Sequence, residues 1–194
     1  MRLILASASP RRAELLRAAG YTFEIVACDV DESMKPGESP STYVRRLAAE
    51  KSAAAMAALN GSASFVILGA DTTVVVDGEI LGKPRDDDEA AAMLQRLSGR
   101  RHEVLTAVSL RQGAYELGRV ETTAVWFLPL TKNDIDSCVA SGECRDKAGA
   151  YAIQGVASRF IPRIDGSYSN VVGLPVATVA ELLTEFRQRA IAGP

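Results

Sequence analysis

The stretch Leu3–Gly20, LILASASPRRAELLRAAG, decides the type of fold. It begins with a continuous apolar run, which predicts a buried strand, and it continues into a helix that Gly20 can end. Ser9 stands at the expected N-cap of that helix, and Pro10 stands at its first position. A buried strand that leads directly into a helix is typical of α/β proteins, so we expect a sheet covered by helices.

The next two residues, Arg11 and Arg12, are unusual at the start of a helix. A helix N-terminus carries partial positive charge, so each cation there costs roughly 0.3–1 kcal/mol. Backbone N–H groups, the hydroxyls of Ser7 and Ser9 and the two guanidinium groups together suit phosphate oxygens. The pattern therefore predicts an anion site, and the alternative is that both arginines simply point into solvent.

Strands and helices alternate along the rest of the chain, with one long antiparallel pair between them. We expect a hairpin that turns at Asp77-Gly78 and two long strands that turn near Gln112-Gly113. Further strands are predicted at 2–7, 22–28 and 65–70, and helices at 41–58, 86–99, 131–142 and 176–191. The sequence contains no evident linker, so we expect one domain over residues 1–194. Its fold is predicted as a mixed α/β sheet flanked by helices in two lobes.

The composition excludes several classes of protein. A net charge of −2 over 194 residues argues against a broad nucleic-acid-binding face. The longest apolar runs are too short to span a bilayer, and the first residues lack the layout of a secretory signal. Three cysteines without a CxxC pair fit a reducing compartment and no structural zinc. We therefore expect a cytoplasmic protein with no membrane and no stable nucleic-acid partner.

Two acidic residues stand where chemistry is plausible. Asp71 follows the predicted strand FVILGA, and ligands often gather at strand ends in α/β sheets. It could be a general base, a metal ligand or a turn residue. Glu32, next to Asp31, is of the kind that holds Mg²⁺ together with substrate phosphates, or else belongs to a polar loop.

Basic and amide groups are scattered through segments that are predicted to be structured. Lys51, Lys83 and Lys147 could each be a surface residue, but with the two arginines they could line a pocket for a polyphosphate tail. In DKAGAYAIQG, Tyr151 offers a stacking face or a hydroxyl. Gln154 offers an amide donor and acceptor that could recognise a base edge such as that of uracil or thymine.

Eight motifs together resemble the Maf proteins, over nearly the whole chain from Leu3 to the last helix. In chain order they are LASASPRR, DVDES, RLAAEKS, LGADTTV, LGKPRD, LSGRRHEVLTAV, DKAGAYAIQG and GSYSNVVGLP. The resemblance implies an elongated α/β fold with a deep cleft between two lobes, similar to inosine triphosphatase-like enzymes. It also implies hydrolysis of a nucleoside triphosphate to the monophosphate and pyrophosphate with Mg²⁺ or Mn²⁺, and it suggests a homodimer.

The resemblance also implies roles for individual residues. Ser7 or Ser9 and the two arginines would hold phosphates, and Glu32, Lys51 and Lys83 would line the catalytic cleft. Asp71 would accept the proton of the attacking water, which leaves Glu32 as the metal ligand. The positions linked to substrate choice are Arg12, Thr72 and Gln154. On this view Arg12→Ala should harm turnover much more than folding and could even stabilise the empty protein.

The motifs also favour one branch of the family. SPRR, GADT and DKAGAYxIQG are similar to the branch that acts on dTTP and UTP, whereas the branch acting on 7-methyl-GTP tends to carry SPWRR, SDQ and CAGSFxxEG. The resemblance therefore implies a pyrophosphatase that acts on dTTP and UTP and on modified pyrimidine nucleotides. The alternatives are a pyrophosphatase for a modified purine nucleotide and a nucleotide- or DNA-binding regulator of cell division.

Overall fold

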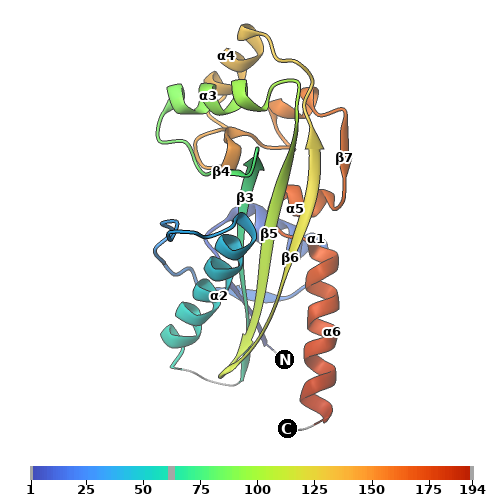
Figure 1. Cartoon of the computed structure of the whole chain (residues 1–194). Coiled ribbons are helices and arrows are strands. Elements are labelled where there is room, and N and C mark those ends of the chain that lie inside the picture. The colour runs from blue at the N-terminus through green and yellow to red at the C-terminus, as the bar shows by residue number, and fades with distance from the viewer. Residues whose placement is uncertain (1, 61–63, 193–194) are drawn as a thin grey trace. The chain divides into compact units, whose positions relative to one another are not determined.

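The computed structural model describes residues 2–60 and 64–192. The chain forms two compact units, of which the first comprises residues 1–71, 106–121 and 173–194 and the second comprises residues 72–105 and 122–172. One seven-stranded sheet has the order β2-β1-β3-β5-β6-β7, with β4 paired to β3 (Figure 1). Three of these strands, β3, β5 and β6, contribute residues to both units.

The first unit is built on parallel pairing around its first strand. Leu3 of β1 is in register with Phe23 of β2 on one side and with Val66 of β3 on the other. The strands and helices of this unit are β1 Arg2–Ala6, α1 Pro10–Ala18, β2 Phe23–Ile25, α2 Pro40–Ala58, β3 Phe65–Val76 and α6 Val176–Ala192, and β5 Arg101–Gln112 and β6 Tyr115–Trp126 enter it in part.

Two apolar layers enclose the sheet of the first unit. Side chains of α1 and α6, such as Leu16 and Leu182, pack with Leu3 and Leu5 of β1 on one face. On the other face α2 contributes Ala55 and Met56, which pack with Ile4 and Ile67. Figure 1 shows α2 and α6 on opposite sides of the strands. The predicted sheet with flanking helices is therefore confirmed.

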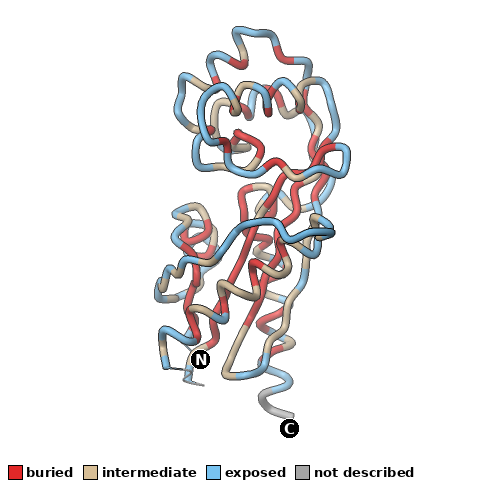
Figure 2. The backbone as a smooth tube through the Cα atoms, turned by 60° about the vertical axis from the view of Figure 1, so that its left-hand side comes forward, coloured by how far each residue is buried: buried red, intermediate tan, exposed pale blue. Residues whose placement is uncertain are grey.

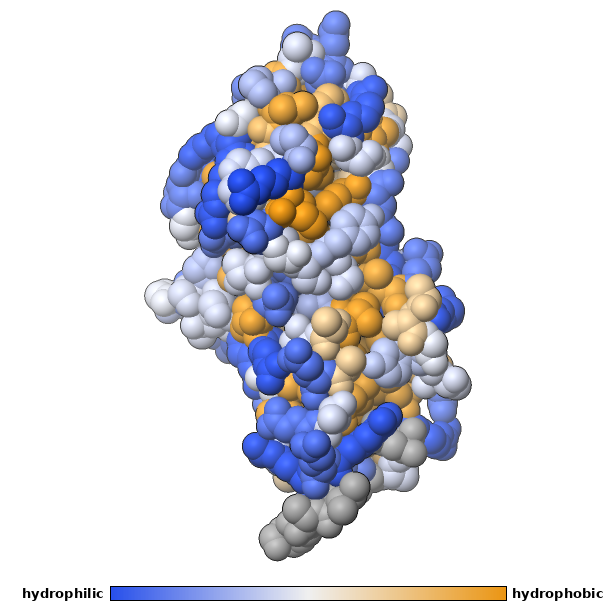
Figure 3. Space-filling model, turned by 90° about the vertical axis from the view of Figure 1, so that its right-hand side faces the viewer, coloured by the Kyte–Doolittle hydropathy of each residue, from blue (hydrophilic) through white to orange (hydrophobic). Residues whose placement is uncertain are grey.

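The second unit has its own core and mostly antiparallel pairing. It adds β4 Glu79–Leu81, α3 Asp87–Leu97, α4 Lys132–Ala140, β7 Arg163–Asp165, α5 Tyr168–Val172 and the 3₁₀ turns Ala148–Ala150 and Val156–Phe160. Leu94 of α3, Cys138 of α4 and Val125 of β6 are among its buried side chains. Figure 2 shows that buried residues concentrate in the strands, and Figure 3 shows hydrophobic patches bordered by hydrophilic residues on one face.

Most local predictions are confirmed. Asp77 and Gly78 turn the hairpin with φ angles of 53° and 77°, as the two central residues of a type I′ turn require. Thr131 and Asp134 form a capping box at the start of α4. The predicted strand 22–28 is shorter than expected, since β2 ends at Ile25. None of the helices in the described ranges is long and apolar enough to cross a membrane.

The prediction that a strand ends just before Asp71 is wrong. β3 runs without interruption from Phe65 to Val76, so Asp71 lies inside it. The strand continues because it changes partners: its parallel register with β1 reaches Gly69, and its antiparallel register with β4 begins at Val74. The deep cleft and the single domain over residues 1–194 stay predictions.

Candidate active site

Asp71 lies where the parallel pairing of β1 with β3 stops. Ala6, the last residue of β1, is in register with Gly69, so Asp71 lies two residues beyond the end of its neighbour. The residue is buried, with 8% of its surface exposed. The end of a parallel strand pair is a common ligand position in α/β sheets, and Asp71 lies at such an end although its own strand continues.

The ammonium of Lys51 joins two carboxylates. Its Nζ donates to Oδ1 of Asp71 at 2.6 Å and to Oε1 of Glu32 at 2.7 Å. The side chain of Lys51 is 12% exposed and that of Asp71 is 11% exposed, while that of Glu32 is 43% exposed. The structure thus brings together three of the predicted residues, from α2, β3 and the loop before α2.

Helix α2 packs close to β3 beside Asp71 because the strand has a glycine, Gly69, where the helix contacts it. A Cβ atom on Gly69 would lie 2.3 Å from the carbonyl oxygen of Ala48 and 2.8 Å from the backbone nitrogen of Ser52. Side chains two residues apart in a strand share a face, so Gly69 and Asp71 both face α2. The close approach at Gly69 therefore sets the position of Lys51 beside Asp71.

The loop that carries Glu32 is tied to α2 by two residues that the sequence interpretation missed. The hydroxyl of Tyr43 donates to the carbonyl of Glu32 at 2.8 Å, and Arg46 donates to the carbonyl of Ser33 at 3.0 Å and to the carboxylate of Glu38. The bond from Arg46 lowers the pKa of Glu38 to about 2. Burial, together with the charges of Asp71 and Glu32, raises the pKa of Tyr43 to about 12. Tyr43 and Arg46 are three residues apart and lie side by side on α2, and this spacing is the signal of them that the sequence contains.

Arg12 is buried, and its guanidinium is bound to backbone carbonyls. Its Nε donates to the carbonyl of Gly173 at 2.8 Å, and its Nη1 donates to the carbonyl of Ala70 at 2.8 Å and to Ser7 Oγ at 3.1 Å. Burial lowers the pKa of Arg12, and the charge of Asp71 opposes that shift. Because Arg12 holds the backbone beside Asp71, its loss should harm folding as well as turnover. The expectation that Arg12→Ala would harm turnover much more than folding, and could stabilise the empty protein, is therefore wrong.

The other residues at the start of α1 are arranged differently from a standard cap. Ser9 has the extended backbone of an N-cap, but its side chain makes no capping hydrogen bond. Ser7 is buried, and its Oγ accepts from the backbone N–H of Ser9 at 3.2 Å. Arg11 is partly buried. The Ser7 hydroxyl is thus engaged with Arg12 and the turn before the helix.

The remaining predicted residues belong to the second unit. Thr72 follows Asp71 in β3 and is partly buried, whereas Lys83 and Gln154 are exposed. The Nζ of Lys147 donates to the carbonyl of Glu143 and to the carboxylate of Asp146. Tyr151 does not offer an open ring or hydroxyl as expected, because it is 7% exposed and its hydroxyl is 2.8 Å from His102 Nε2.

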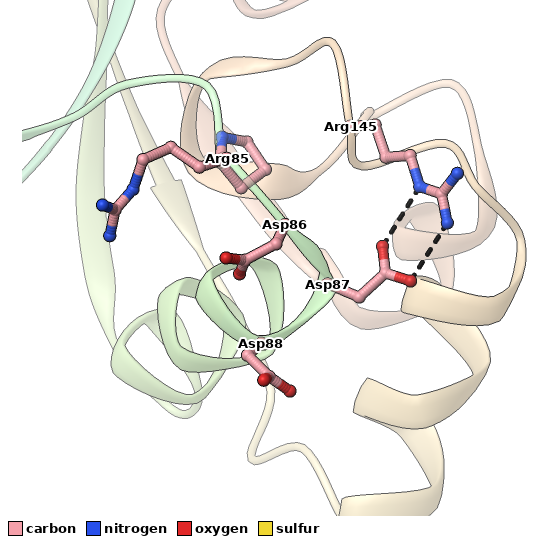
Figure 4. A pocket seen from close by; sticks show the side chains of 6 residues that line it. Arg85, Asp86, Asp87, Asp88 and Arg145 are labelled. Carbon is pink, nitrogen blue, oxygen red and sulfur yellow. Dashed lines mark hydrogen bonds and ion pairs between the residues drawn. The ribbon is translucent and has the colours of Figure 1, made fainter.

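A surface hollow in the second unit lies at the start of α3. Its lining residues are Pro84, Arg85, Asp86, Asp87, Asp88 and Arg145 (Figure 4). The guanidinium of Arg145 makes two bonds of 3.0 and 3.1 Å to Asp87, and Asp86 caps the helix by accepting from the N–H of Glu89. Asp86 therefore caps the start of α3, and Asp87 forms an ion pair with Arg145.

Two carboxylates of the first unit fit a divalent cation that also binds substrate. Across the described ranges, no group of three or more His, Cys, Asp and Glu residues could hold a metal. Glu32 and Asp71 nevertheless direct one oxygen each at a single cationic nitrogen, at 2.7 and 2.6 Å. Mg²⁺ in substrate complexes commonly uses one or two carboxylates together with phosphate oxygens, so this donor set fits it.

The fold and the site define a mixed α/β protein that gathers carboxylate, ammonium and guanidinium groups at the end of a parallel strand pair. The chain belongs to the Maf-like protein family, whose sequence model matches residues 2–186. The family expected from the eight motifs is thereby confirmed.

The relatives share about half of their residues with this chain. A protein of Hahella chejuensis, named dTTP/UTP pyrophosphatase, is 51% identical over 95% of this chain and 92% of its own length. Proteins with the same name from Shewanella oneidensis and Symbiobacterium thermophilum are 50% and 51% identical, over 95% of this chain and 98% and 93% of theirs.

Two solved structures are more distantly similar. The Ham1 protein of Staphylococcus aureus has a TM-score of 0.46 and 17% identity, covering 66% of this chain and 72% of its own. A dITP/XTP pyrophosphatase of Mycobacterium abscessus has a TM-score of 0.48 and 18% identity, covering 97% of both chains.

Proposed function

We propose that this Maf-like protein is a nucleoside triphosphate pyrophosphatase that hydrolyses dTTP and UTP to the monophosphate and pyrophosphate. The observation that carries this proposal is the ammonium of Lys51 between Asp71 and Glu32. The names of relatives that are about 50% identical over 95% of the chain support the nucleotide class.

Asp71 is the proposed proton acceptor. Its carboxylate takes a proton from a water molecule whose oxygen attacks the α-phosphorus. The bond from that phosphorus to the bridging oxygen then breaks, and pyrophosphate leaves with the bonding electron pair. The buried setting of Asp71 supports this role, because charged groups interact more strongly where water is excluded.

Positive and hydroxyl groups are the proposed phosphate contacts. In the first unit these are Ser7, Ser9 and Arg11, together with the N–H groups at the start of α1. Lys51 is a further proposed phosphate contact of this unit. Lys83 and Lys147 are proposed contacts from the second unit. The proposed determinants of substrate choice are Arg12, Thr72 and Gln154.

Glu32 is the proposed ligand of Mg²⁺ or Mn²⁺. A carboxylate that holds the metal tightly is a poor base, so the two roles are divided between Glu32 and Asp71. When bound, the cation polarises the phosphoryl group and offsets its charge. Tyr43 keeps the loop of Glu32 on α2 through the 2.8 Å bond to its carbonyl, which orients the ligand for that task.

We propose that the protein works in the cytoplasm. The three cysteines are free thiols, which fits a reducing compartment such as the cytoplasm. We also propose a homodimer and a single domain over residues 1–194, with no stable nucleic-acid partner.

A nucleotide panel with product identification tests this function. The protein with Mg²⁺ should release pyrophosphate and monophosphate from dTTP and UTP. Asp71→Asn should lose roughly a hundredfold or more in kcat, whereas Asp136→Asn, at an exposed carboxylate of α4, should not. Orthophosphate with a diphosphate product would contradict the proposal. Faster turnover of 7-methyl-GTP would indicate a modified purine substrate, and tight binding without turnover would indicate a regulator.

A further inference from the structure

A chain of hydrogen bonds joins α2 to the hairpin of β5 and β6 within the first unit. Arg111 Nε donates to Ser52 Oγ at 3.1 Å, the hydroxyls of Ser52 and Ser109 are 2.8 Å apart, and Ser109 Oγ donates to Glu116 Oε1 at 2.6 Å. Both serines are fully buried. Each hydroxyl has one proton. Ser109 gives its proton to the carboxylate, and Ser52, which accepts from Arg111, shares its proton between Ser109 Oγ and the carbonyl of Ala49 at 2.9 Å. The two serines thus link the cation of Arg111 to the anion of Glu116.

The second oxygen of Glu116 holds α2 at another point. Arg45 Nη2 donates to Glu116 Oε2 at 2.6 Å. Arg45 and Ser52 are two turns apart on one face of α2, so one carboxylate secures the helix at both positions. Gly118, two residues after Glu116 in β6, provides the space, because a Cβ atom there would lie 2.4 Å from Arg45 Cζ.

The bonds that Glu116 makes to α2, directly and through the serines, also fix the position of Lys51. Lys51 is the next residue along α2, and its Nζ must reach both Asp71 and Glu32 at hydrogen-bond distance. A shift of α2 along its axis would move that nitrogen away from both carboxylates. We propose that Glu116 is a positioning residue, which holds α2 through Arg45 and through Ser109 and Ser52 so that Lys51 lies between Asp71 and Glu32. The effect on turnover rests on the proposed function.

A double-mutant cycle with Lys51 tests this. Glu116→Gln should lower kcat for UTP by roughly tenfold with little change in KM, and Lys51→Met should lower it further. The double variant should equal Lys51→Met alone, because the influence of Glu116 passes through Lys51. Losses that multiply would overturn the proposal, since they would mean that Glu116 acts independently of Lys51.

A matched control removes a carboxylate that pairs with the same strand. Glu181 of α6 binds Arg119 of β6 at 2.5 Å and has no part in the proposed chemistry. Glu181→Gln should leave kcat for UTP unchanged. If Glu116→Gln unfolds too readily for kinetics, Ser109→Ala cuts only the hydroxyl chain and enters the same cycle.

A second measurement needs no catalysis. The ligand-free protein is treated with acetic anhydride, and acetylation of Lys51 is followed by mass spectrometry, with Lys35, whose side chain is 60% exposed, as the internal reference. Glu116→Gln should raise the relative labelling of Lys51 several-fold. Raised labelling in a protein that does not hydrolyse UTP would refute the proposed function and leave this inference standing. Unchanged labelling would overturn the inference itself.

Discussion

The guanidinium of Arg12 binds three groups from three segments of the first unit. These are the hydroxyl of Ser7 before α1, the carbonyl of Ala70 in β3 and the carbonyl of Gly173 after α5. A planar fork of N–H donors can serve several acceptors at once, which a lysine ammonium on a flexible stem does less well. At the scale of one residue, the position that looked like a charge out of place is a link between distant parts of the backbone.

Arg12→Ala should therefore destabilise the protein. The carbonyls of Ala70 and Gly173 would each lose a charged donor, and an unsatisfied buried acceptor costs roughly 1–3 kcal/mol. We expect the free energy of unfolding to fall by about 2–5 kcal/mol, measured by urea denaturation, with Arg12→Lys intermediate. Arg11→Ala, at the partly buried neighbour, is the control and should change it by less than about 1 kcal/mol. An unchanged urea midpoint for Arg12→Ala would show that these bonds contribute nothing.

Helix α2 is the element that assembles the site. Its side chains bind the Glu32 loop through Tyr43 and Arg46, the β5–β6 hairpin through Arg45 and Ser52, and Asp71 through Lys51. Its backbone lies against β3 at Gly69. The positions of Glu32, Lys51 and Asp71 relative to one another thus depend on where this one helix lies on the sheet.

Gly69→Ala should move α2. The added methyl group would lie 2.3 Å from the carbonyl oxygen of Ala48, a backbone atom that can give way only if the helix shifts. We expect unfolding by urea to require roughly 1–3 kcal/mol less, as for other overpacked sites. Turnover of UTP should fall by roughly a hundredfold if Lys51 is displaced by about an ångström.

Gly82→Ala is the matched control for stability. Nothing lies within 4 Å of a Cβ atom at Gly82, so the urea midpoint should stay unchanged there. Equal effects of the two substitutions on unfolding would mean that the close approach at Gly69 is unimportant.

Local elements could be predicted from the sequence, and contacts between distant segments could not. The hairpin at Asp77-Gly78 and a helix that starts near Thr131 depend on neighbouring residues, and both were predicted. The passage of β3 through Asp71 depends on which strands pair with it, and the burial of Arg12 depends on Gly173, far along the chain. Residue types pointed to Lys51, Glu32 and Asp71, but their ion pairs depend on distant contacts. The close approach at Gly69 brings Lys51 to Asp71, and the bonds from Tyr43 and Arg46 bring the Glu32 loop to α2.

At the scale of the whole molecule, each unit has its own acid-sensitive groups. In the first unit, hydrogen bonds hold the pKa of Glu38 at about 2, so its contribution to stability is present above its ordinary pKa and is lost as the pH falls toward 2. In the second unit, burial lowers the pKa of His102 to about 4. The ring of His102 packs at right angles to Phe127 and Tyr151, and its Nδ1 has no hydrogen-bond partner among the described residues.

The histidine should make the second unit sensitive to mild acid. An unfolded histidine has its ordinary pKa of about 6.5, so between about pH 6.5 and pH 4 the unfolded chain binds a proton that the folded chain does not. Stability therefore rises with pH across that window and falls as the pH is lowered through it. From near pH 7.5 to about pH 5 the protein should lose about 2 kcal/mol through His102 alone.

His102→Gln removes the titrating ring and leaves an amide that can still bind the hydroxyl of Tyr151. Urea unfolding at the two pH values should show that the variant loses about 2 kcal/mol less than the parent on acidification, although it is less stable at neutral pH. Tyr151→Phe, which keeps the histidine, should retain the acid dependence. Equal losses in His102→Gln and the parent would mean that other groups cause the acid sensitivity, and that burial of His102 has little effect on its protonation.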